Sequence, residues 1–203
     1  MSWLHVVSGF FGLALLAATI ACRLACRWPL PRAALAAIAM AAGALIFVPV
    51  GDLSTVEYAR GALGDLSITS QVLLIVYLAS CVIGRRLIDA QNFKAIMFSV
   101  AGAALLLYPL ALGLTYFDPY ALGYRSVYFA TALLFGTLLA WYAGRYWLVA
   151  CVVLALLSHA GGVLESDNIW DYLIDPLIAI YALVWTISLL AVSIVRRRAV
   201  QPS

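Results

Sequence analysis

Charged residues are scarce in this sequence: only 10% of its 203 residues are Asp, Glu, Lys or Arg. A soluble domain carries about 25% charged residues, so this scarcity excludes an ordinary soluble domain. Lysine is nearly absent, and the single one, Lys94, lies between apolar segments. A retinal-binding seven-helix protein is excluded as well, because it needs a lysine in its last helix.

Motifs that would identify a chemistry are also missing. The chain contains no G-x-x-x-x-G-K-[ST] phosphate loop and no H-E-x-x-H zinc motif. The segment "GALGD" at 61–65 does not supply the G-x-G-D of intramembrane aspartyl proteases. The segment "EYARG" at 57–61 lacks the spaced downstream aspartates of a CDP-alcohol transferase signature. Function therefore has to be inferred from the placement of individual side chains.

What the sequence does have is apolar residues, which make up 66% of the chain. They are arranged in seven runs, and about 20 apolar residues are needed for a helix to cross a bilayer. We therefore predict an all-α polytopic membrane protein, a seven-helix transmembrane bundle forming a single domain, 1–203. The predicted spans are 3–22, 33–50, 66–84, 95–117, 126–143, 146–164 and 176–195.

The basic residues predict the orientation of these spans. Ten of the 12 fall in one set of connecting segments, and only Arg60 and Arg125 fall in the other set. By the positive-inside rule, the N-terminus lies outside and the C-terminus lies in the cytoplasm. The outer loops are then 51–65, 118–125 and 165–175, and they hold most of the acids. The high ratio of Arg to Lys and the lack of N-x-[ST] sequons fit a bacterial inner membrane.

The first outer loop contains residues that typically begin and end a short helix, which we expect to lie at the membrane interface. Ser54 and Glu57 form an S-x-x-E capping box, which predicts a helix from about Thr55 to Leu63. Gly64 suits the left-handed position after that helix, and Asp65 is expected to cap the third span. In the last outer loop, Asn168 with Asp171 forms a weaker capping pair. Helix capping thus accounts for several of the acids.

The remaining outer polar residues define a candidate site. His159 is the most interior ionisable residue, and such groups are often functional in membranes. We expect His159, Asp171 and Glu57 as catalytic candidates, with His159 moving a proton. Either arginine could hold a phosphate or carboxylate bidentately. The substrate-binding candidates are Arg60, Arg125, Asp52, Asp65 and Asp167.

A metal or cofactor is not specified by the sequence. His159 could join His5 and the acids in a metal site, but it could equally be a neutral histidine bonded to Ser158 or a carbonyl. If 165–176 is helical, Asp167, Asp171 and Asp175 share one face. On the opposite side of the membrane, Cys22 and Cys26 share a helix face, yet two ligands do not complete a zinc site. We therefore expect these cysteines to be small apolar filler, in the reduced form.

Three functions remain open. The predicted membrane core holds no Asp, Glu, Lys or Arg, so the leading expectation is an inner-membrane accessory or scaffold protein with an acidic outer surface. Its partners would be lipid, other membrane proteins or a second copy through the small-residue stripe Ala132, Gly136, Ala140 and Gly144. The first alternative is a membrane enzyme or ligand-binding protein that uses the outer site. The second is a small-solute transporter with a three-one-three helix arrangement, using Ser67, Thr69, Ser70, Gln71 and Tyr77.

Overall fold

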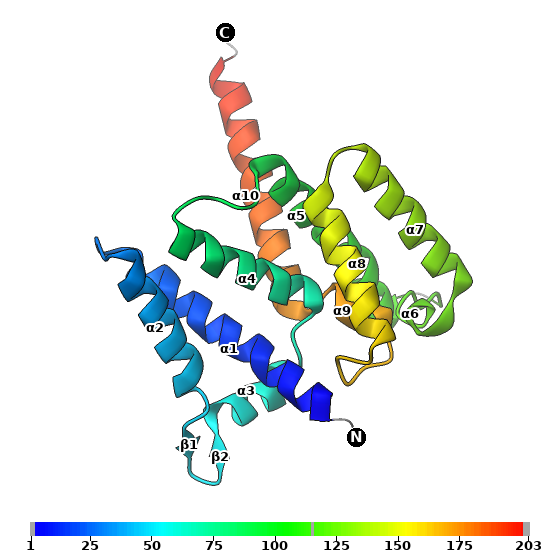
Figure 1. The fold of residues 1–203 in the computed structure, drawn as a ribbon. Coiled ribbons are helices and arrows are strands. Elements are labelled where there is room, and N and C mark those ends of the chain that lie inside the picture. Colours follow the sequence, from blue (N-terminus) through cyan, green and yellow to red (C-terminus); the bar gives the residue numbers. More distant parts are fainter. Residues whose placement is uncertain (1–2, 115, 201–203) are drawn as a thin grey trace. The chain divides into compact units, whose positions relative to one another are not determined.

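A computed structural model describes residues 3–114 and 116–200 of the chain (Figure 1). Helices account for 76% of it, which confirms the all-α prediction. Among the described residues, strand is limited to two short segments, Pro49–Val50 and Leu53–Ser54.

The chain divides into two compact units that are interleaved in sequence. The first comprises the chain up to Asp89 together with Val149–Asp175. The second comprises Ala90–Leu148 together with the chain from Pro176 onwards.

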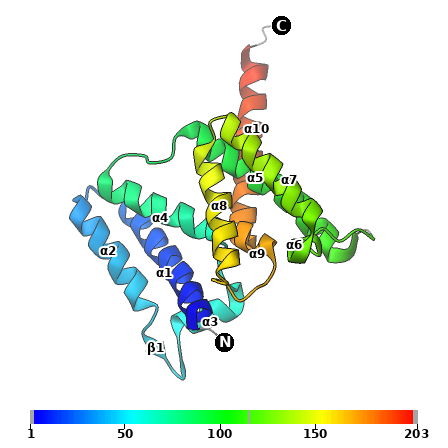
Figure 2. The same cartoon turned by 45° about the vertical axis from the view of Figure 1, so that its right-hand side comes forward.

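Three apolar helices form the body of the first unit: α1 (Trp3–Ala25), α2 (Arg32–Leu45) and α4 (Ile68–Ile83). They pack against one another, as Figures 1 and 2 both show. Small side chains allow helix backbones to approach closely, and the buried cluster between these helices is built mainly from them. Its members are Ala18, Cys22, Ala25, Leu35 and Ala39.

A short hairpin and one more helix connect α2 to α4. The strands β1 (Pro49–Val50) and β2 (Leu53–Ser54) pair antiparallel. They are followed at once by α3 (Thr55–Leu63), which packs against α1. Val56, on α3, is fully buried, and its amide donates to the Ile46 carbonyl at 2.8 Å. The interfacial helix therefore forms where the capping box predicts it.

The rest of the first unit comes from far along the chain. Helix α8 (Tyr146–Ala160) begins in the second unit and ends in the first, and α9 (Ile169–Leu173) follows it. A buried cluster joins both helices to the start of α4. It contains Ile68, Ala155, Leu164 and Tyr172.

In the second unit, α5 (Ala90–Pro109) packs along α10 (Pro176–Val200). Two rings of α5 meet one indole of α10 edge to face, with ring centroids 5.4 Å apart for Phe93–Trp185 and 5.9 Å apart for Phe98–Trp185. The π turn η1 (Leu110–Leu114) continues α5. Two further helices, α6 (Leu122–Arg125) and α7 (Val127–Tyr142), complete this unit.

Within the described residues, seven apolar helices occupy the places predicted for spans, and three of them are long and apolar enough to cross a membrane. These segments are His5–Ala25, Ala90–Gly113 and Pro176–Ser193. The other four, α2, α4, α7 and α8, are apolar helices of 10–17 residues. The structure thus supports membrane association through three apolar helices.

Several predicted ends are wrong for identifiable reasons. Helix α2 ends at Leu45 instead of residue 50, because Pro49 disfavours helical geometry before it. Helix α8 ends at Ala160 instead of residue 164, since Gly162 takes a φ of 58°. Helix α5 starts at Ala90, earlier than predicted. Its first turn is polar, so the hydropathy of the sequence did not indicate that this turn belongs to the helix.

Large apolar side chains remain exposed along α7, as expected for a helix that faces lipid. Phe135, Leu138 and Leu139 have relative exposures of 62%, 54% and 68%. Soluble monomers rarely expose contiguous apolar patches of this kind. The exposed face therefore agrees with a membrane environment.

Candidate functional site

The first unit contains an open pocket of about 700 Å³ beside the N-terminal half of α1. Its walls come from α1, from α3 and the turn after it, and from the loop between α8 and α9 together with the first turn of α9. Its lining residues are Phe10, Glu57, Arg60, Gly61, Gly64, Asp65, Leu164, Glu165, Ser166 and Asp171.

Arg60 joins the three walls of this pocket. Its Nε donates to Asp65 Oδ1 at 2.6 Å and its Nη2 to Asp65 Oδ2 at 3.0 Å, the bidentate geometry that favours an arginine–carboxylate pair. Nη2 also lies 3.3 Å from Glu165 Oε2, and the guanidinium carbon lies 5.8 Å from the centre of the Phe10 ring. The bonds to Asp65 hold the pKa of Arg60 above its ordinary value. Arg60 is therefore a fixed positive group with its charge already paired.

Gly9 on α1 makes room for this ion pair. A Cβ atom at residue 9 would overlap Asp65 Oδ1 and Arg60 Nε. One turn further on, a Cβ at Gly12 would lie 3.3 Å from the Leu66 side chain. The two glycines thus let the backbone of α1 lie directly against the turn that carries Asp65.

Glu57 lies at the start of α3, where its carboxylate closes the predicted capping box. Oε2 accepts from the Ser54 amide and from the Ser54 hydroxyl, both at 2.6 Å. These bonds lower the pKa of Glu57. The capping prediction is confirmed, and the Glu57 side chain is held at the rim of the pocket.

The loop after α8 presents Ser166 to the pocket, and the first turn of α9 presents Asp171. The Ser166 hydroxyl donates to Asp171 Oδ2 at 2.5 Å, and Asn168 accepts from the Trp170 amide at 3.0 Å as the N-cap of α9. The predicted Asn168 cap is confirmed. The segment 165–176 is not one continuous helix, because α9 spans only Ile169–Leu173, so the condition for Asp167, Asp171 and Asp175 to share a helical face is not met.

Asp175 has a structural position beneath the pocket loops. It is 4% exposed, and one carboxylate oxygen accepts from the Ser67 amide at 3.0 Å, the Ser67 hydroxyl at 2.7 Å and the Ser70 hydroxyl at 2.5 Å. Ser67, not Asp65, is the N-cap of α4. The prediction of Asp65 as that cap is wrong, since Arg60 holds its carboxylate.

His159 is bonded to the backbone of the same loop. Its Nε2 lies 3.0 Å from the Asp167 carbonyl oxygen, and its ring meets Tyr172 edge to face at 5.1 Å. The buried Tyr172 hydroxyl in turn donates to the Leu164 carbonyl and accepts from the Leu164 amide, each at 3.1 Å. Burial raises the pKa of Tyr172. His159 therefore matches the alternative of a histidine bonded to a carbonyl.

The structure gathers four of the eight predicted site residues in the pocket: Glu57, Arg60, Asp65 and Asp171. The others lie elsewhere in the described chain. Asp52 is exposed in the hairpin turn and Asp167 is exposed before α9. His159 ends α8 without lining the pocket, and Arg125 ends α6 in the second unit.

Six residues that line the pocket were not among the predicted site residues: Phe10, Gly61, Gly64, Leu164, Glu165 and Ser166. Glu165 could have been predicted, because it is an acid in an outer loop to which helix capping assigns no local role. Phe10 could not, since it is one apolar residue among many in α1. The pairing of Arg60 with Glu165, 105 residues apart, is a tertiary contact that spacing does not reveal.

The pocket has an excess of negative charge. Four carboxylates and one guanidinium line it, and the guanidinium is already bonded to two of those carboxylates. An anionic ligand would have to displace an internal partner of Arg60 and approach the remaining acids. A cationic group meets complementary charge instead.

The chain matches no protein-family model, no curated protein and no solved structure with which it was compared.

Proposed function

We propose that this chain is a membrane-embedded binding protein whose pocket takes a small organic cation carrying an ammonium or guanidinium group. The observation that carries the proposal is the pocket of about 700 Å³ lined by four carboxylates around one paired arginine. Ligand sites are commonly concave, with a few polar groups set in apolar walls. This role corresponds to the ligand-binding alternative drawn from the sequence, with the charge of the ligand reversed.

The positions of two carboxylates in the pocket support a cationic ligand. Glu165 is 62% exposed and contacts Arg60 through one oxygen at 3.3 Å, a long distance for an ion pair. Asp171 Oδ2 accepts from Ser166, which fixes the orientation of the carboxylate in the pocket wall. Glu165 lies in the loop between α8 and α9, and Asp171 lies in the first turn of α9. They provide a pair of acceptors for the several N–H donors of an ammonium or guanidinium.

The apolar residues in the pocket wall favour an organic cation as the ligand rather than a metal ion. Phe10 and Leu164 line the same pocket as the acids, and the ring of Phe10 already lies against the Arg60 guanidinium. An aromatic face attracts organic cations, and apolar side chains cover the carbon skeleton of such a ligand. The volume is also far greater than a single ion needs.

The experiment is a binding titration on the full chain in detergent micelles. Spermidine, arginine methyl ester and ethanolamine are the cationic probes, with succinate as an anionic probe, and the readouts are isothermal titration calorimetry and thermal stabilisation. We expect at least one cation to bind and succinate not to bind. Asp171→Asn should weaken cation binding about tenfold, because one charge-assisted hydrogen bond contributes about 1.5–3 kcal/mol.

Asp167→Asn is the matched control. This aspartate is four residues before Asp171 and is exposed, but it does not line the pocket, so binding should be unchanged. Equal losses in the two variants would indicate a general surface-charge effect and would reject the site. Tighter binding of succinate than of every cation would reject the ligand class.

The proposal includes a topology in which all seven apolar helices cross a bacterial inner membrane, with the pocket outside. Membrane crossing by the four shorter helices requires an experimental test, because 16 residues of α-helix span about 24 Å while the hydrocarbon core is about 30 Å thick. Fusions of alkaline phosphatase and green fluorescent protein to each terminus test this arrangement. Activity of the phosphatase only at the N-terminus and fluorescence only at the C-terminus are expected; both termini on one side would contradict it.

An accessory role through α7 is a second proposal, favoured by the surface of that helix. Ala132 and Gly136 are exposed, and a Cβ at Gly136 would meet open space. They are the exposed members of the predicted small-residue stripe on α7, and small residues permit close helix contact. Ala140 is buried, and Gly144 lies beyond the end of α7. If α7 joins two copies, Gly136→Leu should convert a dimer to a monomer by light scattering in detergent, and Gly102→Leu, also in open space on α5, should not. A monomeric wild-type chain would reject self-association.

The transporter alternative receives less support. Ser67, Ser70 and Gln71 are buried, and their polar groups bond within the first unit. Two of them bond to Asp175, and Gln71 Nε2 donates to the Leu66 carbonyl at 3.0 Å. Polar groups engaged in this way hold the start of α4 in place.

A further inference from the structure

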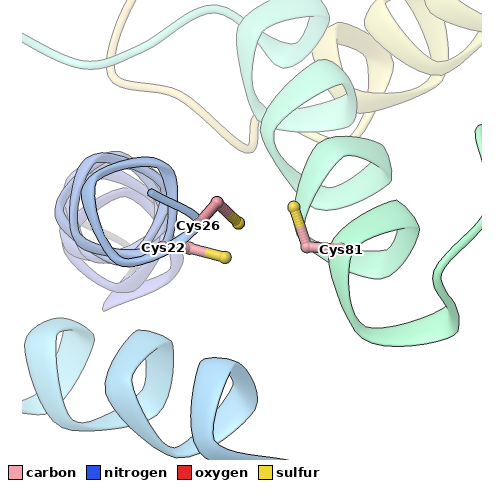
Figure 3. Close-up of side chains that lie close together, drawn as sticks. All are labelled: Cys22, Cys26 and Cys81. Atoms are coloured by element: carbon pink, nitrogen blue, oxygen red, sulfur yellow. The ribbon is translucent and has the colours of Figure 1, made fainter. Parts of the chain in front are cut away.

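We propose that Cys22, Cys26 and Cys81 form a binding site for a soft, thiolate-preferring metal ion, Cu(I) or Zn(II). Their three Sγ atoms all lie within 4.8 Å of one another. Figure 3 shows the sulfurs of Cys22 and Cys26 directed from the end of α1 towards Cys81 on α4. The site is independent of the acidic pocket and of its ligand.

Local structure explains why the two cysteines of α1 act together. Cys26 directly follows the last helical residue, Ala25, and its amide still donates to the Cys22 carbonyl at 2.9 Å. The helical turn therefore includes Cys26, and side chains four residues apart share one face. Cys81, in the last turn of α4, supplies the third sulfur from the facing helix. The sequence could not show this third ligand, because it is 55 residues from Cys26.

The distances suit metal coordination after a small adjustment. With a metal–sulfur bond of about 2.3 Å, three sulfurs in a trigonal plane are about 4.0 Å apart. The separations of at most 4.8 Å therefore need to close by about 0.8 Å or less, which side-chain rotation supplies. Three thiolates satisfy three-coordinate Cu(I); Zn(II) would keep its fourth position for water.

Burial and access are also suited to a bound ion. Cys22 is 1% exposed and fixed in the helix contact, Cys81 is partly buried, and Cys26 is exposed. The exposed thiol provides a path by which the ion can enter. Among the described residues these three form the one group of possible ligands with this mutual spacing.

Positive charge nearby offsets the charge of the loaded site. Three thiols release three protons when three sulfur–metal bonds form, which leaves two negative charges with Cu(I) and one with Zn(II). The guanidinium of Arg32 lies against Gly84, one turn beyond Cys81. Arg23 and Arg27 are the immediate neighbours of the two cysteines of α1. The positive-inside prediction places all these groups in the reducing cytoplasm, where thiols remain available.

The test measures metal stoichiometry and affinity on the full chain, purified in detergent and reduced under anaerobic conditions. Cu(I) is supplied in competition with bathocuproine disulfonate, and Zn(II) in competition with a chromogenic chelator. We expect one equivalent of at least one of the two metals to bind per chain. Cys81→Ser and Cys26→Ser should each weaken binding at least tenfold, because each removes one of three ligands.

Cys151→Ser is the matched control, since Cys151 is equally buried, on α8, and is not a member of the group. It should leave stoichiometry and affinity unchanged. Bound metal should also raise the melting temperature of wild-type protein but not that of Cys81→Ser, which separates binding to the folded site from binding to loose thiols.

Two results would overturn the proposal. One is a wild-type chain that binds no more of either metal than a Cys22→Ser/Cys26→Ser/Cys81→Ser variant. The other is an equal loss of affinity in Cys151→Ser and Cys26→Ser. Because Cys26 is exposed, its serine variant should fold normally, so the second comparison stands even if Cys81→Ser does not fold.

Discussion

The buried carboxylate of Asp175 should be one of the most sensitive positions in the first unit. Its Oδ2 accepts three hydrogen bonds from Ser67 and Ser70 at the start of α4. Asp175→Asn keeps the shape of the side chain and retains an oxygen acceptor, but it removes the negative charge. The substitution therefore isolates the electrostatic part of these bonds.

The expected magnitude follows from the difference between charged and neutral hydrogen bonds. A bond to a charged group contributes about 1.5–3 kcal/mol and a neutral one about 0.5–1.5 kcal/mol. Loss of about 1 kcal/mol for each of three bonds gives about 3 kcal/mol for Asp175→Asn. Asp175→Ala leaves buried donors without this acceptor and should cost more, about 3–5 kcal/mol, because unmet buried donors lose about 1–3 kcal/mol each.

Thermal unfolding in detergent, at one fixed scan rate, measures the effect. For a chain of about 200 residues, 1 kcal/mol corresponds to about 2–4 °C, so Asp175→Asn should lower the melting temperature by about 6–12 °C. The exposed Asp167→Asn should change it by less than about 1 °C. A double-mutant cycle with Ser70→Ala should show coupling, since the two residues share a hydrogen bond. Equal melting temperatures for Asp175→Asn and Asp167→Asn would refute the reasoning.

Three further changes test other contacts. Gly9→Ala should lower stability by about 1–3 kcal/mol, because its Cβ overlaps the Arg60–Asp65 pair, whereas Gly102→Ala, in open space within α5, should be neutral or stabilising; equal effects in thermal unfolding would contradict the close approach of α1. Glu57→Gln should remove the part of the pH dependence of stability that comes from Glu57. Because folding lowers the pKa of Glu57 from 4.5, this carboxylate stabilises the fold fully above pH 4.5, and its contribution is lost as the pH falls through the pKa of the folded state. Identical stability profiles of the variant and wild-type protein between pH 6 and pH 3 would exclude the capping bond. Tyr172→Phe should cost about 1–2 kcal/mol in thermal unfolding, because it removes two buried bonds to the Leu164 backbone; a neutral result would show that those bonds are not formed.

Local sequence rules predicted the elements whose causes are themselves local. The helix Thr55–Leu63 was predicted from Ser54, Glu57 and Gly64 alone, and the structure confirms it. The cap at Asn168 is confirmed for the same reason. Capping depends on residues within one turn of each other, so spacing is enough to identify it.

Contacts between distant segments could not be predicted in this way. Asp65 resembles a helix cap in sequence, but the tertiary approach of Arg60 and Gly9 gives its carboxylate a different partner. Cys81 gained significance only when α4 was placed against α1. Helix lengths were overestimated where hydropathy continued past a backbone break, as at Pro49 and Gly162.

The interleaving of the two units has a consequence for biogenesis. Ser67 and its acceptor Asp175 are 108 residues apart, and Arg60 and Glu165 are 105 apart. A ribosome that has released the first three apolar helices must therefore synthesise the whole intervening segment before either contact can form. Until then the serine hydroxyls at the head of α4 lack the carboxylate that anchors them. A chain truncated just before Asp175 should therefore be degraded by quality-control proteases faster than one truncated a few residues after it.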